Sequence, residues 1–211
     1  MDSINTGYPN SPAPCGDKKR LRGMLRAARR GLGEEDQQRA ARGLLAQLTE
    51  LEIFRLARRI ALYLPNDGEI DTGEVIRWCR RNGRRPYLPV VQREGGRNWL
   101  LFGEYREDCG FSPNNLGIPE PVLDPSELVP AHDLDLVLLP LVGFDLEGNR
   151  IGMGGGFYDT TFEFIREARA DQPILIGIAH EIQRVERIDV ESWDIPLPMV
   201  VTERGVYRFG K

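Results

Sequence analysis

Apolar residues recur along the chain in two spacings, which together predict alternating strands and helices. Short apolar runs bounded by Gly, Pro or charged residues indicate buried strands at residues 59–64, 85–91, 134–144, 174–180, 199–202 and 206–209, with a further strand or hairpin over 98–109. Helical spacing indicates helices at residues 18–32, 34–51, 69–81 and from the glycine cluster to 170. This alternation predicts an α/β fold with a mainly parallel, Rossmann-like sheet between helices, a three-layer αβα arrangement.

The first sixteen residues contain Gly, Pro, Ser and Asn and have little to bury, which predicts a disordered tail. Residues 17–211 are then expected to form a single domain. No apolar run reaches the roughly 20 residues that span a bilayer, and residues 1–16 lack the apolar core of a signal peptide. The three cysteines have no metal-binding spacing and indicate reduced thiols. We therefore expect a cytoplasmic protein, without a membrane partner and monomeric.

The charge balance limits the kind of ligand. The net charge of −4 and the pI near 5.4 argue against nucleic acid as the main partner. Local basic clusters still suit a small polyanion, and one follows the predicted tail: KKRLRGMLRAARRGL, from residue 18. Only three of the 28 basic residues are lysines, and two of them, Lys18 and Lys19, stand here together. The segment predicts a cationic helix beside an anionic ligand; the alternative is a solvated charged face.

A glycine cluster follows the longest apolar run of the chain. Residues 134–144 lead through a polar turn, 145–150, to glycines at 152 and 154–156 and then to Phe157-Tyr158-Asp159. Glycines between a strand and a helix let backbone N–H groups approach a phosphate. Arg150 suits a phosphate and Asp159 a metal ion. The spacing is neither the Rossmann fingerprint nor a Walker A loop, so the pattern alone leaves a flexible turn as the alternative.

Other polar residues follow the ends of predicted strands. In parallel sheets the ligand crevice lies at the carboxyl ends of the strands, so residues 64–69, 145–159 and His180 are expected to converge. Glu69 is alternatively a carboxylate that stabilises a helix start, and a structural role is the alternative for His180. The proline-fixed stretch 115–121 is expected to form a lid or a wall, or simply a rigid loop.

Three motifs together carry a family resemblance. They are YLPNDGEIDT at 63–72, RIGMGGGFYD at 150–159 and WDIPLP at 193–198, and the likeness extends from Lys18 to about Phe209. The chain resembles the 5-formyltetrahydrofolate cyclo-ligases, also called 5,10-methenyltetrahydrofolate synthetases, most closely the bacterial branch. The resemblance implies a ligase that uses ATP and Mg²⁺ to cyclise 5-formyltetrahydrofolate into 5,10-methenyltetrahydrofolate and releases ADP and phosphate. In that chemistry the formyl oxygen is phosphorylated, N10 attacks the activated carbon, and phosphate leaves.

The resemblance also implies which residues bind ATP. They occupy the basic helix and the glycine loop: Lys18, Lys19, Arg20, Leu21 and Arg22, then Arg150, Ile151, Gly152, Met153, Gly154, Gly155, Gly156, Phe157 and Tyr158. The basic residues are expected to hold the phosphates, which fits phosphoryl transfer because that reaction depends on positioning and charge neutralisation. Arg150 and Asp159 are the implied catalytic residues, and Asp159 and Asp194 the implied Mg²⁺ ligands.

The residues implied to bind folate overlap with this set. They are Arg22, Leu64, Glu69, Met153, Gly154, Gly155, Gly156, Phe157 and Tyr158. Glu69 is expected to accept hydrogen bonds from the pterin, and the apolar and aromatic residues to contact its ring. The chain departs from the family pattern at Phe157, often Tyr, at Gly155, where some members have Lys, at Pro198, where some have Asp, and at Leu116, which is Trp in some eukaryotic members.

Two other functions remain open on the sequence. One is a non-catalytic protein of the same fold that binds folate or nucleotide, although binding alone would not need both Asp159 and Asp194. The other is an enzyme that transfers acyl or phosphoryl groups on an unrelated substrate, against which Glu69 and its apolar neighbours favour a pterin-like ligand.

Overall fold

The computed structural model describes residues 18–115, 117–167, 172–189, 191 and 194–210. The predicted tail, residues 1–16, lies outside the described residues, as does Leu116. No helix in the described part of the chain is both long enough and apolar enough to cross a membrane.

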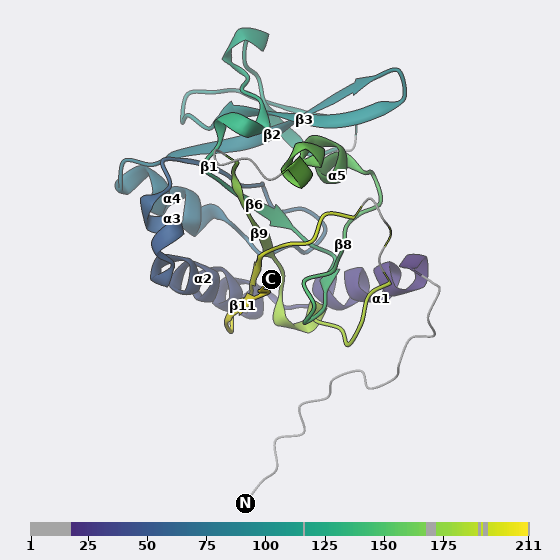
Figure 1. The fold of residues 1–211 in the computed structure, drawn as a ribbon. Helices are drawn as coiled ribbons and strands as arrows, with labels where there is room; N and C mark the ends of the chain where they lie inside the picture. Colours follow the sequence, from purple (N-terminus) through teal and green to yellow (C-terminus); the bar gives the residue numbers. More distant parts are fainter. Residues whose placement is uncertain (1–17, 116, 168–171, 190, 192–193, 211) are drawn as a thin grey trace, which may run out of the picture.

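A seven-stranded sheet forms the centre of the molecule, in the order β11-β10-β9-β6-β1-β2-β3 (Figure 1). Its five central strands pair in parallel, and the two edge strands β3 and β11 are antiparallel. The strands are β1 (Arg59–Ala61), β2 (Arg85–Glu94), β3 (Arg97–Glu104), β6 (Leu136–Pro140), β9 (Ile174–Ile178), β10 (Met199–Val201) and β11 (Val206–Arg208). Two small antiparallel ribbons accompany them: β4 (Phe111–Pro113) with β5 (Pro119–Pro121), and β7 (Gly143–Phe144) with β8 (Arg150–Ile151). The predicted α/β fold is confirmed.

The helices agree with the sequence pattern near the N-terminus and differ later. They are α1 (Lys18–Arg30), α2 (Glu34–Glu50), α3 (Glu52–Leu56), α4 (Gly73–Arg81) and α5 (Phe157–Thr161). The short α3 was not predicted. Helix α4 begins later than expected because the preceding residues bond to Tyr63: its hydroxyl donates to the Ile70 carbonyl at 3.1 Å, and the Thr72 hydroxyl donates to the Tyr63 carbonyl.

The prediction of a helix from the glycine cluster to residue 170 is wrong. Helix α5 has five residues and is followed by a 3₁₀ segment, Glu163–Glu167, while residues 168–170 lie outside the described residues. The Thr161 hydroxyl donates to the Phe157 carbonyl at 2.6 Å and accepts the Leu100 N–H of β3 at 2.8 Å. Such side-chain bonds to the backbone compete with helix propagation, and here they hold the segment against the sheet edge.

The sheet is buried on both faces, as its uninterrupted apolar strands predict. In β6, Leu136 and Leu138 pack in the core beneath α2 and α4, whereas Val137 and Leu139 face a second core that includes Phe162. Figure 1 shows α2, α3 and α4 on one side of the sheet and α5 on the other. The second face is thus covered by short segments rather than by long helices.

The strand order fixes where a ligand can bind. From β1 the chain passes through α4 to β2 on one side, and it later returns to β6 on the other side of β1. Crossovers that leave in opposite directions open a crevice at the carboxyl ends of the two strands. Residues that follow β1 and β6 therefore border this crevice.

Helix α2 approaches the turn between β10 and β11 through a glycine. A Cβ added to Gly43 would lie 2.7 Å from the Glu203 carbonyl oxygen and 3.0 Å from the Glu203 Cβ. By contrast, a Cβ at Gly23 in α1 would meet nothing within 4 Å. The two helical glycines therefore differ in tertiary contact but not in secondary structure.

We expect Gly43→Ala and Gly23→Ala to change stability in opposite directions. Alanine favours a helix over glycine, so Gly23→Ala should raise the free energy of unfolding by roughly 0.5–1 kcal/mol. Gly43→Ala should lower it by roughly 1–3 kcal/mol, because the overlap is with backbone. Urea denaturation of both variants checks this, and an increase for Gly43→Ala would show that helix and turn separate at no cost.

Candidate active site

A cavity of about 1160 Å³ lies at the carboxyl ends of the central strands. It brings together most of the residues expected to form a site: Lys18, Arg22, Leu64, Glu69, Arg150, Ile151, Gly152, Met153, Gly154, Gly155, Gly156, Phe157, Tyr158, Asp159 and Asp194. Lys19, Arg20 and Leu21 do not line it. Lys19 and Arg20 are exposed, and Leu21 packs against the small apolar cluster around Leu25.

Helix α1 presents one basic face to the cavity. Lys18, Arg22 and Arg26 are four residues apart, so they share one side of the helix. The Arg22 Nε donates to the Gly152 carbonyl at 2.7 Å, and the Lys18 Nζ lies 3.3 Å from the Asp194 Oδ2. The helical period thus separates the contiguous basic motif into residues that face the cavity and residues that do not.

Side chains from two elements contact the glycine loop. Gly154 and Gly156 have φ of +92° and +69°, which a residue with a side chain rarely adopts. Arg22 contacts the loop from α1, and from β3 the Asn98 Nδ2 donates to the Gly155 carbonyl at 3.1 Å. Because α5 is only five residues long, any anion held here would depend on the loop N–H groups and nearby cations rather than on a helix dipole.

The opposite wall comes from β2, β3 and the β4–β5 ribbon. The guanidinium of Arg93 lies 5.5 Å from the centre of the Phe157 ring, and both residues line the cavity. The ribbon contributes Ile118 and Glu120, and Glu120 accepts the Val91 N–H of β2 at 2.9 Å. The proline-fixed stretch therefore forms a wall docked on the sheet.

A buried charge pair contributes to the lining of the cavity. The Arg150 side chain, which is 7% exposed, pairs with the Asp159 carboxylate and donates to the Ile195 carbonyl. Burial lowers the pKa of Arg150, while the carboxylates of Asp159 and Asp194 oppose that shift. Asp194 itself accepts the Glu191 N–H at 2.9 Å.

The carboxylates of Asp159 and Asp194 suit a metal ion only if a bound ligand supplies further oxygen donors. No group of three or more His, Cys, Asp or Glu side chains with metal-binding geometry exists among the described residues. Asp159 and Asp194 both act on Arg150, and their side chains remain 34% and 25% exposed. Mg²⁺ commonly takes one or two protein carboxylates and completes its shell with phosphate oxygens and water. The donor set therefore fits Mg²⁺ that is bound together with a phosphate ligand.

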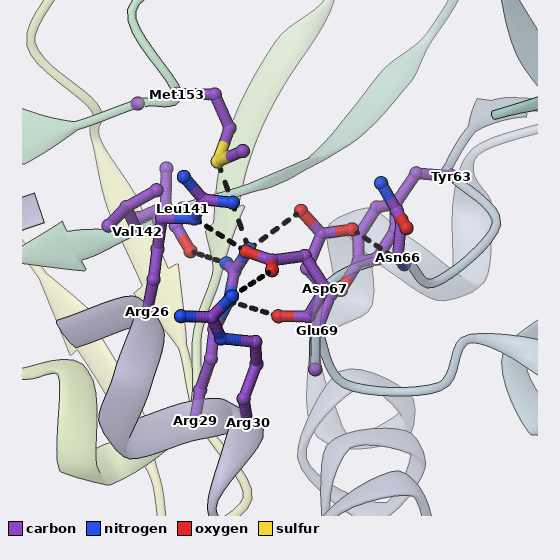
Figure 2. A network of polar contacts seen from close by, with 12 residues as sticks. Arg26, Arg29, Arg30, Tyr63, Asn66, Asp67, Glu69, Leu141, Val142 and Met153 are labelled. Atoms are coloured by element: carbon purple, nitrogen blue, oxygen red, sulfur yellow. Dashed lines mark hydrogen bonds and ion pairs between the residues drawn. The ribbon is translucent and has the colours of Figure 1, made fainter. Parts of the chain in front are cut away.

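Glu69 also lines the cavity, and Figure 2 shows the polar network around its carboxylate. Its carboxylate is 11% exposed, accepts the Asn66 N–H at 3.1 Å and lies 3.5 Å from the Arg29 Nη2. Burial raises the pKa of Glu69 to about 7, with Arg29 as the strongest opposing influence. A carboxyl with such a pKa changes charge near neutral pH, and its acceptor strength changes with it.

Sequence reasoning missed Arg26, Arg29 and Asp67. Arg29 is fully buried and binds Asp67, which also accepts a hydrogen bond from the Arg26 Nε at 2.7 Å. A signal was present, because Arg26 and Arg29 continue the helical face of Lys18 and Arg22 at spacings of four and three. Asp67 has φ of +54°, a left-handed conformation that the turn sequence Asn-Asp-Gly favours.

His180 lies beneath the site and does not line the cavity. Its Nε2 is 3.1 Å from the Gly68 carbonyl, and burial lowers its pKa to about 4. The ring is therefore neutral at physiological pH and donates to that carbonyl, which supports the turn before Glu69. This geometry favours the structural role that sequence analysis left as the alternative.

Known proteins are similar to this chain in sequence and in fold. The model of the 5-formyltetrahydrofolate cyclo-ligase family matches residues 14–203. The 5-formyltetrahydrofolate cyclo-ligase of Escherichia coli K12 is 40% identical over 186 residues, covering 88% of this chain and 100% of the relative. That of Haemophilus influenzae is 36% identical, covering 85% and 94%.

A solved structure agrees. The 5,10-methenyltetrahydrofolate synthetase of Aquifex aeolicus superposes with a TM-score of 0.77 at 29% identity, covering 93% of this chain and 94% of that one. The family resemblance and the ligase activity predicted from the three motifs are thereby confirmed. The chain belongs to the 5-formyltetrahydrofolate cyclo-ligase family.

Proposed function

We propose that the cavity binds 5-formyltetrahydrofolate and ATP together and converts them into 5,10-methenyltetrahydrofolate, ADP and phosphate. The observation that carries this assignment is that Glu69 and the Arg150–Asp159 pair line one and the same cavity. A volume of about 1160 Å³ exceeds the roughly 300–1,000 Å³ of ordinary single-ligand pockets, which supports two substrates side by side.

ATP takes the end formed by α1 and the glycine loop. The loop N–H groups face its phosphates, and Lys18, Arg22 and Arg150 offset their charge. Asp159 and Asp194 would hold Mg²⁺, which supplies further neutralisation of phosphate charge when bound. Lys19 and Arg20, exposed on the other side of α1, contribute less than the family motif implies.

The pterin of the folate takes the other end. Ionised Glu69 accepts hydrogen bonds from the pterin N–H groups, and Leu64 and Tyr158 contact the flat ring. Burial raises the pKa of the Tyr158 hydroxyl, so this side chain remains a neutral donor. The Tyr158 ring stacks on Phe162, at 6.2 Å between centroids and 11° between planes, which fixes its orientation.

The reaction then needs positioning more than covalent help from the protein. The formyl oxygen attacks the γ-phosphorus, the bond to the β–γ bridging oxygen breaks, and ADP leaves. The N10 lone pair next attacks the activated formyl carbon, N10 loses its proton, and the C–O bond breaks to release phosphate. Arg150, buried and fixed by Asp159 and the Ile195 carbonyl, is a preorganised cation for charge at the transferred phosphoryl group.

The proposal also covers assembly and cellular compartment. All the residues described above come from one chain, so a monomer has a complete cavity. Cys79 and Cys109 are both free thiols, which suits the reducing cytoplasm. Light scattering of the purified protein measures the oligomeric state, and a stable dimer would contradict the first of these two inferences.

The function is tested by incubating the protein with 5-formyltetrahydrofolate, ATP and Mg²⁺ while following the methenyl chromophore. We expect the absorbance to rise, with one ADP formed per methenyl group. Binding of both ligands without any product would instead identify a non-catalytic binding protein of this fold.

We predict that Asp159→Asn reduces turnover far more than substrate binding. The substitution removes a negative charge beside Arg150 and one of the two carboxylates available to Mg²⁺, so kcat should fall by about 100-fold or more. The Kd for 5-formyltetrahydrofolate should change little in isothermal titration. Asp36→Asn, at an exposed position of α2, is the matched control. Equal losses of folate binding and turnover would mean that Asp159 is structural.

We predict that binding of the folate weakens as the pH falls below about 7, the pKa of Glu69. Because ionised Glu69 is the acceptor, its protonation should raise the folate KM about tenfold for each pH unit below that value, with the ATP KM unchanged. Glu69→Gln should have a raised folate KM that no longer depends on pH in this range. If the ATP KM changed instead, the assignment of Glu69 to folate binding would be wrong.

A further inference from the structure

Arg29, the penultimate residue of α1, connects two segments that contribute residues to the cavity, and Figure 2 shows its contacts. Its Nε and Nη2 donate to the Asp67 carbonyl and carboxylate at 2.8 and 2.9 Å, and its Nη1 donates to the Leu141 carbonyl at 3.1 Å. The same Nη2 lies 3.5 Å from the Glu69 Oε1. The guanidinium therefore joins α1 to the turn after β1 and to the segment after β6.

Burying a guanidinium costs free energy, so its presence here indicates a role that an apolar residue could not fill. The Arg29 side chain is 0% exposed, and a buried ion pair often adds less stability than well-packed hydrophobic residues would. Among the described residues, Arg29 is the one ion-pair partner of Glu69. Its planar fork also reaches several acceptors at fixed angles, which a lysine ammonium does not.

The backbone contacts point the same way. Glu69 follows a left-handed turn in which Gly68 has φ of +79°. A Cβ on Gly68 would lie 2.9 Å from the Arg29 carbonyl oxygen and 3.0 Å from the Arg30 Cα. The turn thus rests directly on the end of α1, so the position of the Glu69 carboxylate depends on that helix.

We propose that Arg29 is a positioning residue for the folate substrate: it fixes the Glu69 carboxylate in the cavity, and its charge favours the ionised form that accepts the pterin N–H groups. This inference rests on the proposed function, because it takes Glu69 as the folate acceptor. Arg29 itself does not line the cavity, and it acts through Glu69.

The charges around Glu69 support this role. Arg29 and Arg26 approach it from α1, Asp67 lies on its own turn, and the hydroxyls of Tyr63 and Tyr158 lie close enough for their pKa values to respond to Glu69. Of these groups, Arg29 opposes the burial of Glu69 most strongly. Arg26 also favours the charged form, but its Nε is committed to the Asp67 carboxylate at 2.7 Å. Loss of the Arg29 charge therefore raises the pKa of Glu69 further above 7.

The test compares two substitutions that separate charge from geometry. Arg29→Gln removes the charge and keeps a polar side chain, whereas Arg29→Lys keeps the charge and loses the fork. Arg30→Gln is the matched control, because Arg30 is the next residue of the same helix, is 54% exposed, and pairs with Asp67 at 3.4 Å. Initial rates of methenyl formation give kcat and both KM values across neutral pH.

For Arg29→Gln we expect the folate KM to rise about tenfold, the scale of one charge-assisted hydrogen bond, with the ATP KM nearly unchanged. The midpoint of the pH profile of kcat/KM for the folate should move to higher pH. Arg29→Lys should keep a midpoint near that of the wild type with a folate KM raised several-fold, since the ammonium cannot hold the carboxylate in the same place. Arg30→Gln should match the wild type in both readouts.

Two outcomes overturn the inference. One is an Arg29→Gln enzyme whose kcat and two KM values change together while the pH midpoint stays in place, because that pattern indicates a structural residue. The other applies if Arg29→Gln does not fold: an Arg29→Lys enzyme with an unchanged folate KM. Absence of methenyl product from the wild type would instead defeat the proposed function, so the two failures are distinguishable.

Discussion

The shape of the cavity depends on one buried guanidinium, which joins helix α1 to two other segments of the chain. Arg29 binds the Asp67 carboxylate and the Leu141 carbonyl, so it fastens helix α1 to the segments that follow β1 and β6. These strands flank the switch point of the sheet, where a crevice opens because the crossovers diverge. With α1 fixed there, the same helix supplies Lys18 and Arg22 to the phosphate end.

The cavity holds a concentration of cations that the net composition conceals. The chain carries a net charge of −4, yet Lys18, Arg22 and Arg150 all line the cavity. Glu69 lines the same cavity, and burial raises its pKa to about 7. The cationic side chains suit a polyanion, while the buried carboxyl suits a flat heterocycle with N–H donors. Because both kinds of group line one cavity, two substrates bound there would have their reactive groups held close together.

Sequence predicted the features that local chemistry determines. The strand from residue 174 and the helix from Glu34 follow directly from apolar spacing. A strand that is buried on both faces has a continuous apolar run, whereas a helix that is buried on one face has apolar residues three and four positions apart. The glycine loop was recognisable because Gly154 and Gly156 need positive φ. Arg29 was not singled out, because helical spacing places it on the face of Lys18 and Arg22 but does not show that its guanidinium is buried. That distinction depends on Asp67 and Leu141, which are far away in sequence.

The incorrectly predicted helix lies on the face of the sheet whose core residues also line the cavity. A long helix after the glycine loop would cover the second face of the sheet, as helices do in doubly wound folds. Instead, α5 ends after five residues, where the Thr161 hydroxyl accepts the Leu100 N–H of β3. Val91, Leu100 and Leu139 belong to the core on that face, yet they also line the cavity. The core of this face and the wall of the cavity therefore share side chains, and the hydrogen bond between Thr161 and Leu100, which no sequence period reveals, holds α5 against β3 beside them.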